Sequence, residues 1–276
     1  MQNFVEFWLL FFWVVLTGTC LGSFVNAAAL RYVAGQNWIS EPSTCFACHV
    51  RLSFWQNLPL YGWLRHAGYS ACCKQPIPPR YLLIEIFVGL LAALVFLQLG
   101  WQQSLAFMPF FVINCVIFLT DFDDFIIPDW ASLGGLGLGL LLAFVNAPGL
   151  PPIEFALLGA VGGFALLYGV NFLYRLWRRH DGLGFGDVKL IAMLGAWLGP
   201  VALLPILFLA AFAGALVGLA LIACAYASKH NISKHDGPKP MPQDKAHLPF
   251  GCFLVTAAFL WVLCPPLRHI VLMLVP

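Results

Sequence analysis

The chain has 276 residues, of which 61% are hydrophobic and only 9% carry a charged side chain. Soluble domains carry about 25% charged residues, so a soluble fold of this length could not cover its surface. The composition therefore excludes a soluble globular protein and predicts an all-α polytopic membrane protein. The net charge of +2 is uninformative, and no basic stripe outside the loops indicates nucleic acid as a partner.

Apolar stretches predict about eight membrane-spanning helices, because each span needs about 20 mostly apolar residues. The first lacks the basic start of a signal peptide and is too long for one, so we expect a retained helix. The last contains Pro265-Pro266 and should end or kink near Leu263. The eight stretches are residues 4–30, 81–99, 104–120, 131–147, 153–175, 188–199, 201–227 and 250–272.

The Lys and Arg residues predict the orientation, since short cytoplasmic loops are enriched in them. Almost all of them lie in residues 31–80, 175–189 and 228–248, and none lies in 100–103 or 148–152. With eight spans and the amino terminus outside, all three basic loops are cytoplasmic. The chain shows no internal repeat at the level of sequence.

An acidic segment, TDFDDFIIPD, follows the third apolar stretch directly. Charged residues at membrane depth are costly and are usually functional. Asp121 lies closest to the membrane and is the candidate for function, whereas Asp123 and Asp129 are expected to be solvated. If the helix continues by one turn, Asp124 shares a face with Asp121, and Pro128 ends helicity before the next span.

The segment LGFGDVKL places a further aspartate, Asp187, at the start of the sixth apolar stretch. Gly184 and Gly186 allow close backbone approach and positive φ angles. A carboxylate at the start of a helix is stabilised by the helix dipole, so the alternative is a simple N-cap. Lys189, just beyond, either pairs with lipid headgroups or tunes the charge of this site.

Asp121 and Asp187 fall on the same side of the predicted membrane, which suggests a catalytic pair. Two adjacent carboxylates share one proton, so the ionised member activates water and the protonated member polarises a carbonyl. No GxSxG or HExxH segment offers a competing nucleophile or metal site. The sequence therefore predicts aspartic proteolysis.

These motifs resemble the type IV prepilin leader peptidases, which are GxGD-type intramembrane aspartic proteases of the peptidase A24 kind. The resemblance implies that Asp121 and Asp187 are the catalytic pair. It covers nearly the whole chain and rests on TDFDDFIIPD, GFGDVK, the segment GSFVN with Arg31, Arg80-Tyr81 with Glu85, and Pro249-Phe250-Gly251.

The resemblance also implies partners, a cofactor and a location. The substrates would be precursors of pilins or pseudopilins, cleaved at the cytoplasmic face of a bacterial inner membrane whose bilayer holds the enzyme. Many members also methylate the new amino terminus with S-adenosylmethionine, although no GxGxxG loop is present here. Asn26, Arg31 and Glu85 are candidates for shaping the substrate or methyl-donor region.

Four of the nine cysteines lie in the first loop, where the family typically carries two CxxC pairs. Cys45 and Cys48 form the first pair, but the second reads Ser70-Ala71-Cys72-Cys73. Zinc needs four thiolate or imidazole ligands. The first three candidates are Cys45, Cys48 and Cys73, and the fourth is Cys72, His49 or His66.

We therefore divide the chain into a first transmembrane helix (1–30), a cytoplasmic cysteine-containing loop domain (31–80) and a transmembrane aspartic peptidase domain (81–276). The loop domain is the part associated with zinc and methyl transfer. Two alternatives stay open. One is a peptidase without methyltransferase activity, and the other is a carboxylate-based membrane transporter.

Overall fold

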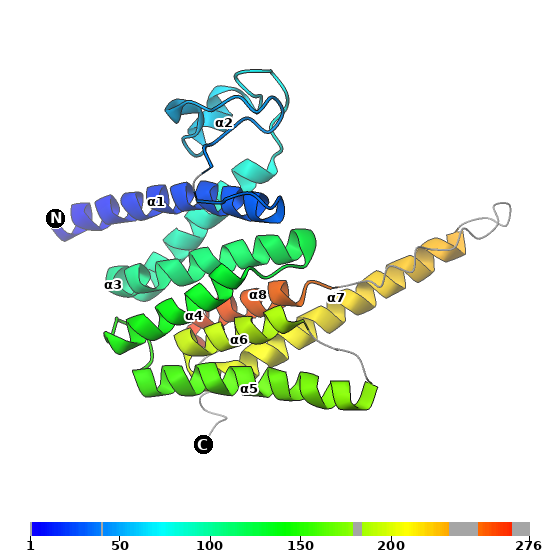
Figure 1. Ribbon diagram of the computed structural model, residues 1–276. Coiled ribbons are helices and arrows are strands. Elements are labelled where there is room, and N and C mark those ends of the chain that lie inside the picture. Colours follow the sequence, from blue (N-terminus) through cyan, green and yellow to red (C-terminus); the bar gives the residue numbers. More distant parts are fainter. Residues whose placement is uncertain (1, 40, 179–183, 232–247, 267–276) are drawn as a thin grey trace.

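The computed structural model describes residues 2–39, 41–178, 184–231 and 248–266, with backbone only for residues 2, 3 and 225–231. Over these residues the chain is helical and contains no strand, as the sequence predicts. Most helices lie side by side, and a small unit of loops and short helices, which includes α2, lies beyond α1 (Figure 1). The elements are α1 (Gln2–Val33), η1 (Phe54–Gln56), α2 (Tyr61–Arg65), α3 (Arg80–Asp124), α4 (Asp129–Phe144), α5 (Ile153–Arg178), α6 (Phe185–Leu198), η2 (Pro200–Ala202), α7 (Leu203–Asn231) and α8 (Phe250–Leu263).

Four segments are long and apolar enough to cross a membrane: Phe4–Val33, Arg80–Asp124, Ile153–Arg178 and Pro200–Cys224. Helices α4 and α8 are shorter but apolar. Each of the eight predicted stretches is helical over most of its described length. The last helix ends at Leu263, which confirms the predicted stop before Pro265; residues 267–272 of that stretch lie outside the described residues.

Helix α3 accounts for two predicted spans. It contains 45 residues, but Gly100 interrupts it with φ 75° and ψ 173°, a conformation that glycine adopts without strain. The chain turns back there, so the two arms of α3 run in different directions (Figure 1). Arg80 and Asp123, near its two ends, form an ion pair. The first and last turns of α3 therefore lie at the same end of the bundle.

Helix α6 forms the centre of the packing, between α4, α5 and α8 (Figure 1). All of its residues from Val188 to Trp197 are buried except Lys189. A Cβ on Gly159 of α5 would lie 2.2 Å from the carbonyl oxygen of Gly195, so only glycine permits this close contact. The Trp197 indole N–H donates to the Gly135 carbonyl of α4 at 2.8 Å. Small residues thus let these helices approach closely, as they do in other membrane bundles.

The segment between α1 and α3 folds as two similar turns. Antiparallel bridges Thr44–Arg51 and Tyr69–Pro76 close them. In the first turn the Cys45 N–H donates to Val50, and in the second the Ser70 N–H donates to Gln75, both at 2.8 Å. The turns end on His49 and Lys74, whose φ angles are 57° and 58°. A local structural repeat is therefore present where the sequence alone showed none, because backbone geometry rather than side-chain identity defines it.

Candidate active site

Asp121 lies in the last turn of α3 and is 5% exposed. Its Oδ2 atom accepts the backbone N–H of Cys252 at 2.9 Å, from the first turn of α8. The first N–H groups of a helix have no intrahelical partner, so they are natural donors to a carboxylate. A Cβ on Gly251 would lie only 2.9 Å from Asp121 Oδ2, so glycine allows this contact.

Asp187 is the third residue of α6 and is 9% exposed. The helix is capped by Gly184, whose φ is −66°, so the N-cap alternative for Asp187 is wrong. Of the two properties that Gly184 and Gly186 allow, positive φ is not used, since neither is among the described glycines with positive φ. Close approach is the real requirement: a Cβ on Gly186 would lie 3.1 Å from Ile127 Cβ.

The fold brings the two buried aspartates to one place. The Asp121 carboxylate acts electrostatically on Asp187. Ile127 packs between their supporting segments, since it lies close to Gly186 of α6 and to Gly251 of α8. Two buried carboxylates at the same end of a helical bundle, one acting electrostatically on the other, can hold a water molecule for acid and base chemistry.

The other acidic residues of this segment have different surroundings. Asp123 was expected to be solvated, but it binds Arg80 with two hydrogen bonds of 2.8 and 2.6 Å, so that expectation is wrong. Asp129 of α4 is exposed and forms an ion pair with Lys189 of α6, so Asp129 is the partner of Lys189. The helix does run on after Thr120, but Phe125, with φ 55°, ends it before Pro128. Asp124 is exposed and does not join the buried Asp121.

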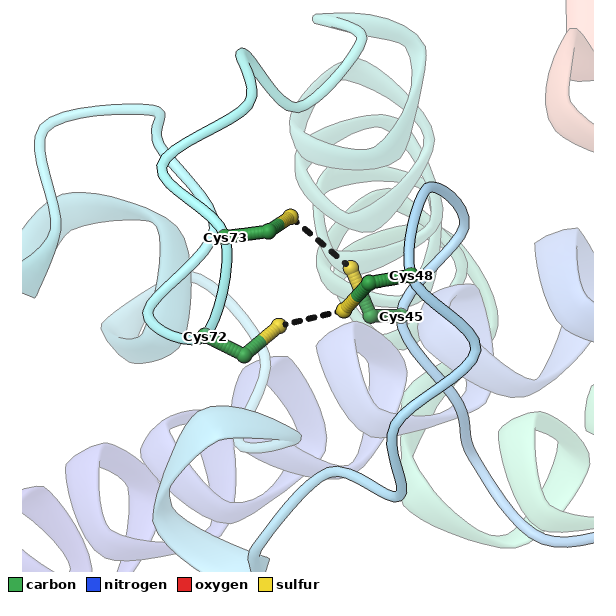
Figure 2. Close-up of side chains that lie close together, drawn as sticks. All are labelled: Cys45, Cys48, Cys72 and Cys73. Atoms are coloured by element: carbon green, nitrogen blue, oxygen red, sulfur yellow. Dashed lines mark hydrogen bonds between the residues drawn. The ribbon is translucent and has the colours of Figure 1, made fainter.

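The loop cysteines meet across the two turns (Figure 2). The sulfur atoms of Cys48 and Cys72 are 3.1 Å apart, and those of Cys45 and Cys73 are 3.8 Å apart. All four lie within 4.8 Å of one another, and neither His49 nor His66 belongs to the cluster. Tetrahedral zinc with Zn–S bonds of about 2.3 Å separates its thiolates by about 3.8 Å, so small shifts would accommodate the ion.

Ser70 occupies the place in the second turn that Cys45 occupies in the first. Its hydroxyl lies 3.1 Å from Cys45 Sγ and 3.0 Å from Cys72 Sγ. Burial raises the pKa of the Cys45 thiol, but hydrogen bonds from Ser70 and from backbone N–H groups outweigh it and lower the pKa to about 6. The contact with Cys72 raises the pKa of Cys48 to about 12. The lowered pKa of Cys45 favours its thiolate, which is the form that binds a cation.

Three candidates for the substrate or methyl-donor region lie near the first turns of α3. Glu85 is buried and accepts the Leu60 N–H at 2.7 Å. Asn26 Oδ1 accepts from Arg80 Nε at 3.2 Å, so it supports the Arg80–Asp123 ion pair. Arg31 donates to the Pro42 carbonyl at 3.3 Å.

Sequence reasoning missed two features of the site. The backbone N–H of Cys252 gives no signal in a sequence, although the preceding Pro249-Phe250-Gly251 marks the right place. The Arg80–Asp123 ion pair joins residues at opposite ends of α3, and no local pattern connects them.

Two family models match the chain: the bacterial peptidase A24 N-terminal domain over residues 16–99 and the type IV leader peptidase family over residues 107–219. A prepilin leader peptidase/N-methyltransferase of Aeromonas hydrophila is 31% identical over 92% of this chain and 91% of that protein. Proteins with the same name are similar in Dickeya chrysanthemi, at 34% over 77% and 82%, and in Neisseria gonorrhoeae, at 37% over 66% and 62%. No solved structure gives a significant match.

Proposed function

Because the chain belongs to the type IV leader peptidase family, we propose that it cleaves the leaders of prepilins or pseudopilins and methylates the new amino termini. Relatives that share most of their length with it carry both activities in their names. The observation that carries the proteolytic half is the meeting of two buried carboxylates, Asp121 and Asp187, from separate helices. The family assignment leaves the transporter alternative without support.

In the proposed mechanism Asp121 and Asp187 share one proton. The ionised carboxylate takes a proton from water as the water oxygen bonds to the scissile carbonyl carbon, and the protonated carboxyl hydrogen-bonds the carbonyl oxygen. The carbon–nitrogen bond then breaks, and the leaving amine takes a proton from the pair. The Cys252 N–H holds one oxygen of Asp121 in place throughout.

The test uses Asp121→Asn and Asp187→Asn in the full chain, co-expressed with a prepilin. Each variant should lower the cleavage rate by at least about 100-fold, because one member of an acid–base pair is lost. Asp124→Asn is the matched control, because Asp124 is exposed in the same turn of α3. This variant should cleave the prepilin at the wild-type rate. Full cleavage by either Asn variant would contradict the assignment.

The proposed topology has eight spans, with Asp121 and Asp187 on the cytoplasmic side of a bacterial inner membrane. Its support is the concentration of Lys and Arg in residues 31–80, 175–189 and 228–248. The proposed boundaries remain a first span (1–30), a cysteine-containing loop domain (31–80) and a peptidase domain (81–276). The substrate's basic leader would stay in the cytoplasm, and its apolar segment would enter between the helices.

The loop domain is proposed to bind one zinc ion through Cys45, Cys48, Cys72 and Cys73. Support comes from the gathering of four sulfur atoms in a segment that has little other core. Zinc there would be structural, since a four-thiolate site leaves no open position for catalysis. In a cytoplasmic loop, metal binding is favoured over stable disulfides.

The methylating half of the function implies S-adenosylmethionine as a cofactor, which supplies a methyl group to an amine when bound. The remaining alternative is a peptidase that leaves the new terminus unmodified. Mass spectrometry of the processed pilin distinguishes the two, because methylation adds a defined mass to the terminal residue. Pilins, type II secretion pseudopilins and competence pseudopilins are all candidate clients.

A further inference from the structure

A cavity of about 360 Å³ lies between the end of α1, the cysteine turns and the first turns of α3. Ser23 and Glu85 contribute from the two long helices, and Cys45, Trp63 and Ser70 contribute from the loop segment. Its volume is in the range of about 300–1,000 Å³ that small-molecule sites occupy. Among the lining residues, Cys45 belongs to the cysteine cluster and Ser70 contacts it, so the arrangement of the cluster determines the shape of one cavity wall.

Glu85 distinguishes this cavity chemically, because no other described lining residue has an acidic side chain. It is 8% exposed, and its neighbours are the Leu60 N–H and the Ser23 hydroxyl, both neutral. Within the described part of the chain, Glu85 forms no ion pair. A buried carboxylate is costly unless a cation accompanies it, so a cavity built around one is suited to a cationic ligand.

Trp63 and Ser70 line the loop side of the cavity. The Trp63 indole N–H is buried and has no hydrogen-bond partner among the described residues. Unpaired buried donors are rare in folded proteins, so this N–H is an unusual feature of the loop segment. The cavity therefore offers the Glu85 carboxylate on its helix side, where Arg31 also lines it but donates to the Pro42 carbonyl.

We propose that this cavity is the site of methyl transfer, in which Glu85 and Ser23 bind the new amino terminus of the processed substrate and the loop wall holds a sulfonium methyl donor. This inference rests on the methylating half of the proposed function. The donor fits by the volume of the cavity and by the aromatic and polar side chains, Trp63 and Ser70, that line its loop side.

The substrate amine belongs on the helix side for a geometric reason. The new amino terminus directly precedes the apolar segment of the pilin, so it stays at the boundary of the membrane. Glu85 lies in the second turn of α3, and Arg80 in the first turn is bound to Asp123, two residues beyond Asp121. The two sites thus share one end of the bundle, and a product terminus leaving the aspartate pair meets Glu85 there.

When bound, the donor supplies the methyl carbon: its carbon–sulfur bond breaks with the electron pair left on sulfur, the amine nitrogen forms the new bond, and one amine proton passes to Glu85. The carboxylate serves this step because an ammonium has no lone pair to attack with until a base accepts its proton. Ser23 keeps the carboxylate oriented toward the cavity.

The experiment measures three quantities on the full-length protein in membranes or detergent: cleavage of a prepilin, methylation of the product by mass spectrometry, and retention of radiolabelled S-adenosylmethionine. Glu85→Gln should cleave normally and retain the donor, but methylate at least about 100-fold more slowly. Ala27→Trp, which fills the cavity from α1, should cleave normally and lose donor retention. Glu41→Gln, an exposed acid of the same loop, is the control and should behave as wild type in all three.

The outcomes separate the inference from the proposed function. If the wild type methylates and Glu85→Gln does so equally, the inference is overturned and the proposed function stands. The same holds if Ala27→Trp retains the donor, or if Glu85→Gln loses cleavage and methylation together. If the wild type cleaves without methylating, the methylating half of the proposed function fails, and the inference fails with it.

Discussion

Asp121 owes its position to a backbone group of another helix. The Cys252 N–H reaches its Oδ2 atom at 2.9 Å, and the absence of a side chain at Gly251 allows the approach. Asp187 is placed in a different way, as the third residue of a helix in which most of the other residues are buried. The two carboxylates are therefore held by rigid elements, which is what a catalytic pair requires.

At the residue scale we predict that Gly251→Ala impairs cleavage without unfolding the protein. The new Cβ would lie 2.9 Å from Asp121 Oδ2 and push the carboxylate away from the Cys252 N–H. A displacement of about 1 Å at a catalytic group costs up to about 100-fold in rate. Prepilin cleavage by purified enzyme measures the effect.

The control for this variant is Gly137→Ala in α4, where a new Cβ meets nothing within 4 Å. It should cleave at the wild-type rate. Equal rates for the two alanine variants would show that Asp121 does not depend on this close contact.

At the scale of elements, ion pairs tie the helices together at the end of the bundle that holds the aspartates. Arg80 binds Asp123 through two hydrogen bonds and joins both ends of α3, with Asn26 of α1 as a third partner. Lys189 of α6 binds Asp129 of α4, but Asp129 is 64% exposed whereas Asp123 is 18% exposed. A half-buried pair with two hydrogen bonds stabilises more than an exposed pair.

Asp123→Asn should therefore lower thermal stability more than Asp129→Asn. We expect a loss of about 1 kcal/mol for the first variant and only a few tenths of a kcal/mol for the second, since solvent screens the exposed pair. Thermal unfolding in the same detergent measures both. A larger effect at Asp129 would contradict the view that the Arg80 pair holds the arms of α3 together.

The two turns of the loop segment allow a second test at the scale of elements, which asks which residues bind zinc. Ser70 stands where the repeat would place a cysteine, and Cys72 supplies the fourth sulfur from the neighbouring position. Cys72→Ser should reduce bound zinc from one ion per chain to a small fraction, because only three thiolates remain. Adding Ser70→Cys to that variant should restore the ion.

Zinc content is measured by elemental analysis of purified protein before and after dialysis against a chelator. The single variant Ser70→Cys is the control, since it should keep its zinc. Loss of zinc in the double variant would show that the second turn does not present position 70 to the metal.

On the scale of the whole molecule, the two proposed sites lie near the two ends of one helix, α3. The last turn of α3 carries Asp121, and its second turn carries Glu85, which lines the cavity beside the cysteine turns. Gly100 makes this possible, because the turn there brings the two ends of α3 to one end of the bundle. In the proposed function, a substrate would thus be cut and modified without crossing the membrane.

The orientation of the bundle gives a further prediction. Alkaline phosphatase fused after Pro148 should be active, because the connection between α4 and α5 faces the outside in the proposed topology. Fused after Asn57, in the cysteine-containing loop, it should be inactive, whereas a fluorescent protein at that position should fluoresce. Phosphatase activity at Asn57 would contradict the cytoplasmic placement of the loop and of both sites.

The sequence by itself determined the fold class, the approximate ends of the helices and the identity of the candidate aspartates. It could do so because apolar stretches and charges within them are local signals that need no knowledge of distant contacts. The same holds for the stop at Leu263, which two prolines impose.

Only the tertiary structure decided how distant residues meet. The bond from Cys252 to Asp121, the pairing of Arg80 with Asp123 and the gathering of Cys72 with the other thiols depend on contacts between separate elements. The glycines show the same division: Gly139 packs against Trp197, whereas Gly137 of the same helix meets nothing within 4 Å. A sequence gives the spacing of such residues, but packing alone determines which face of a helix is buried.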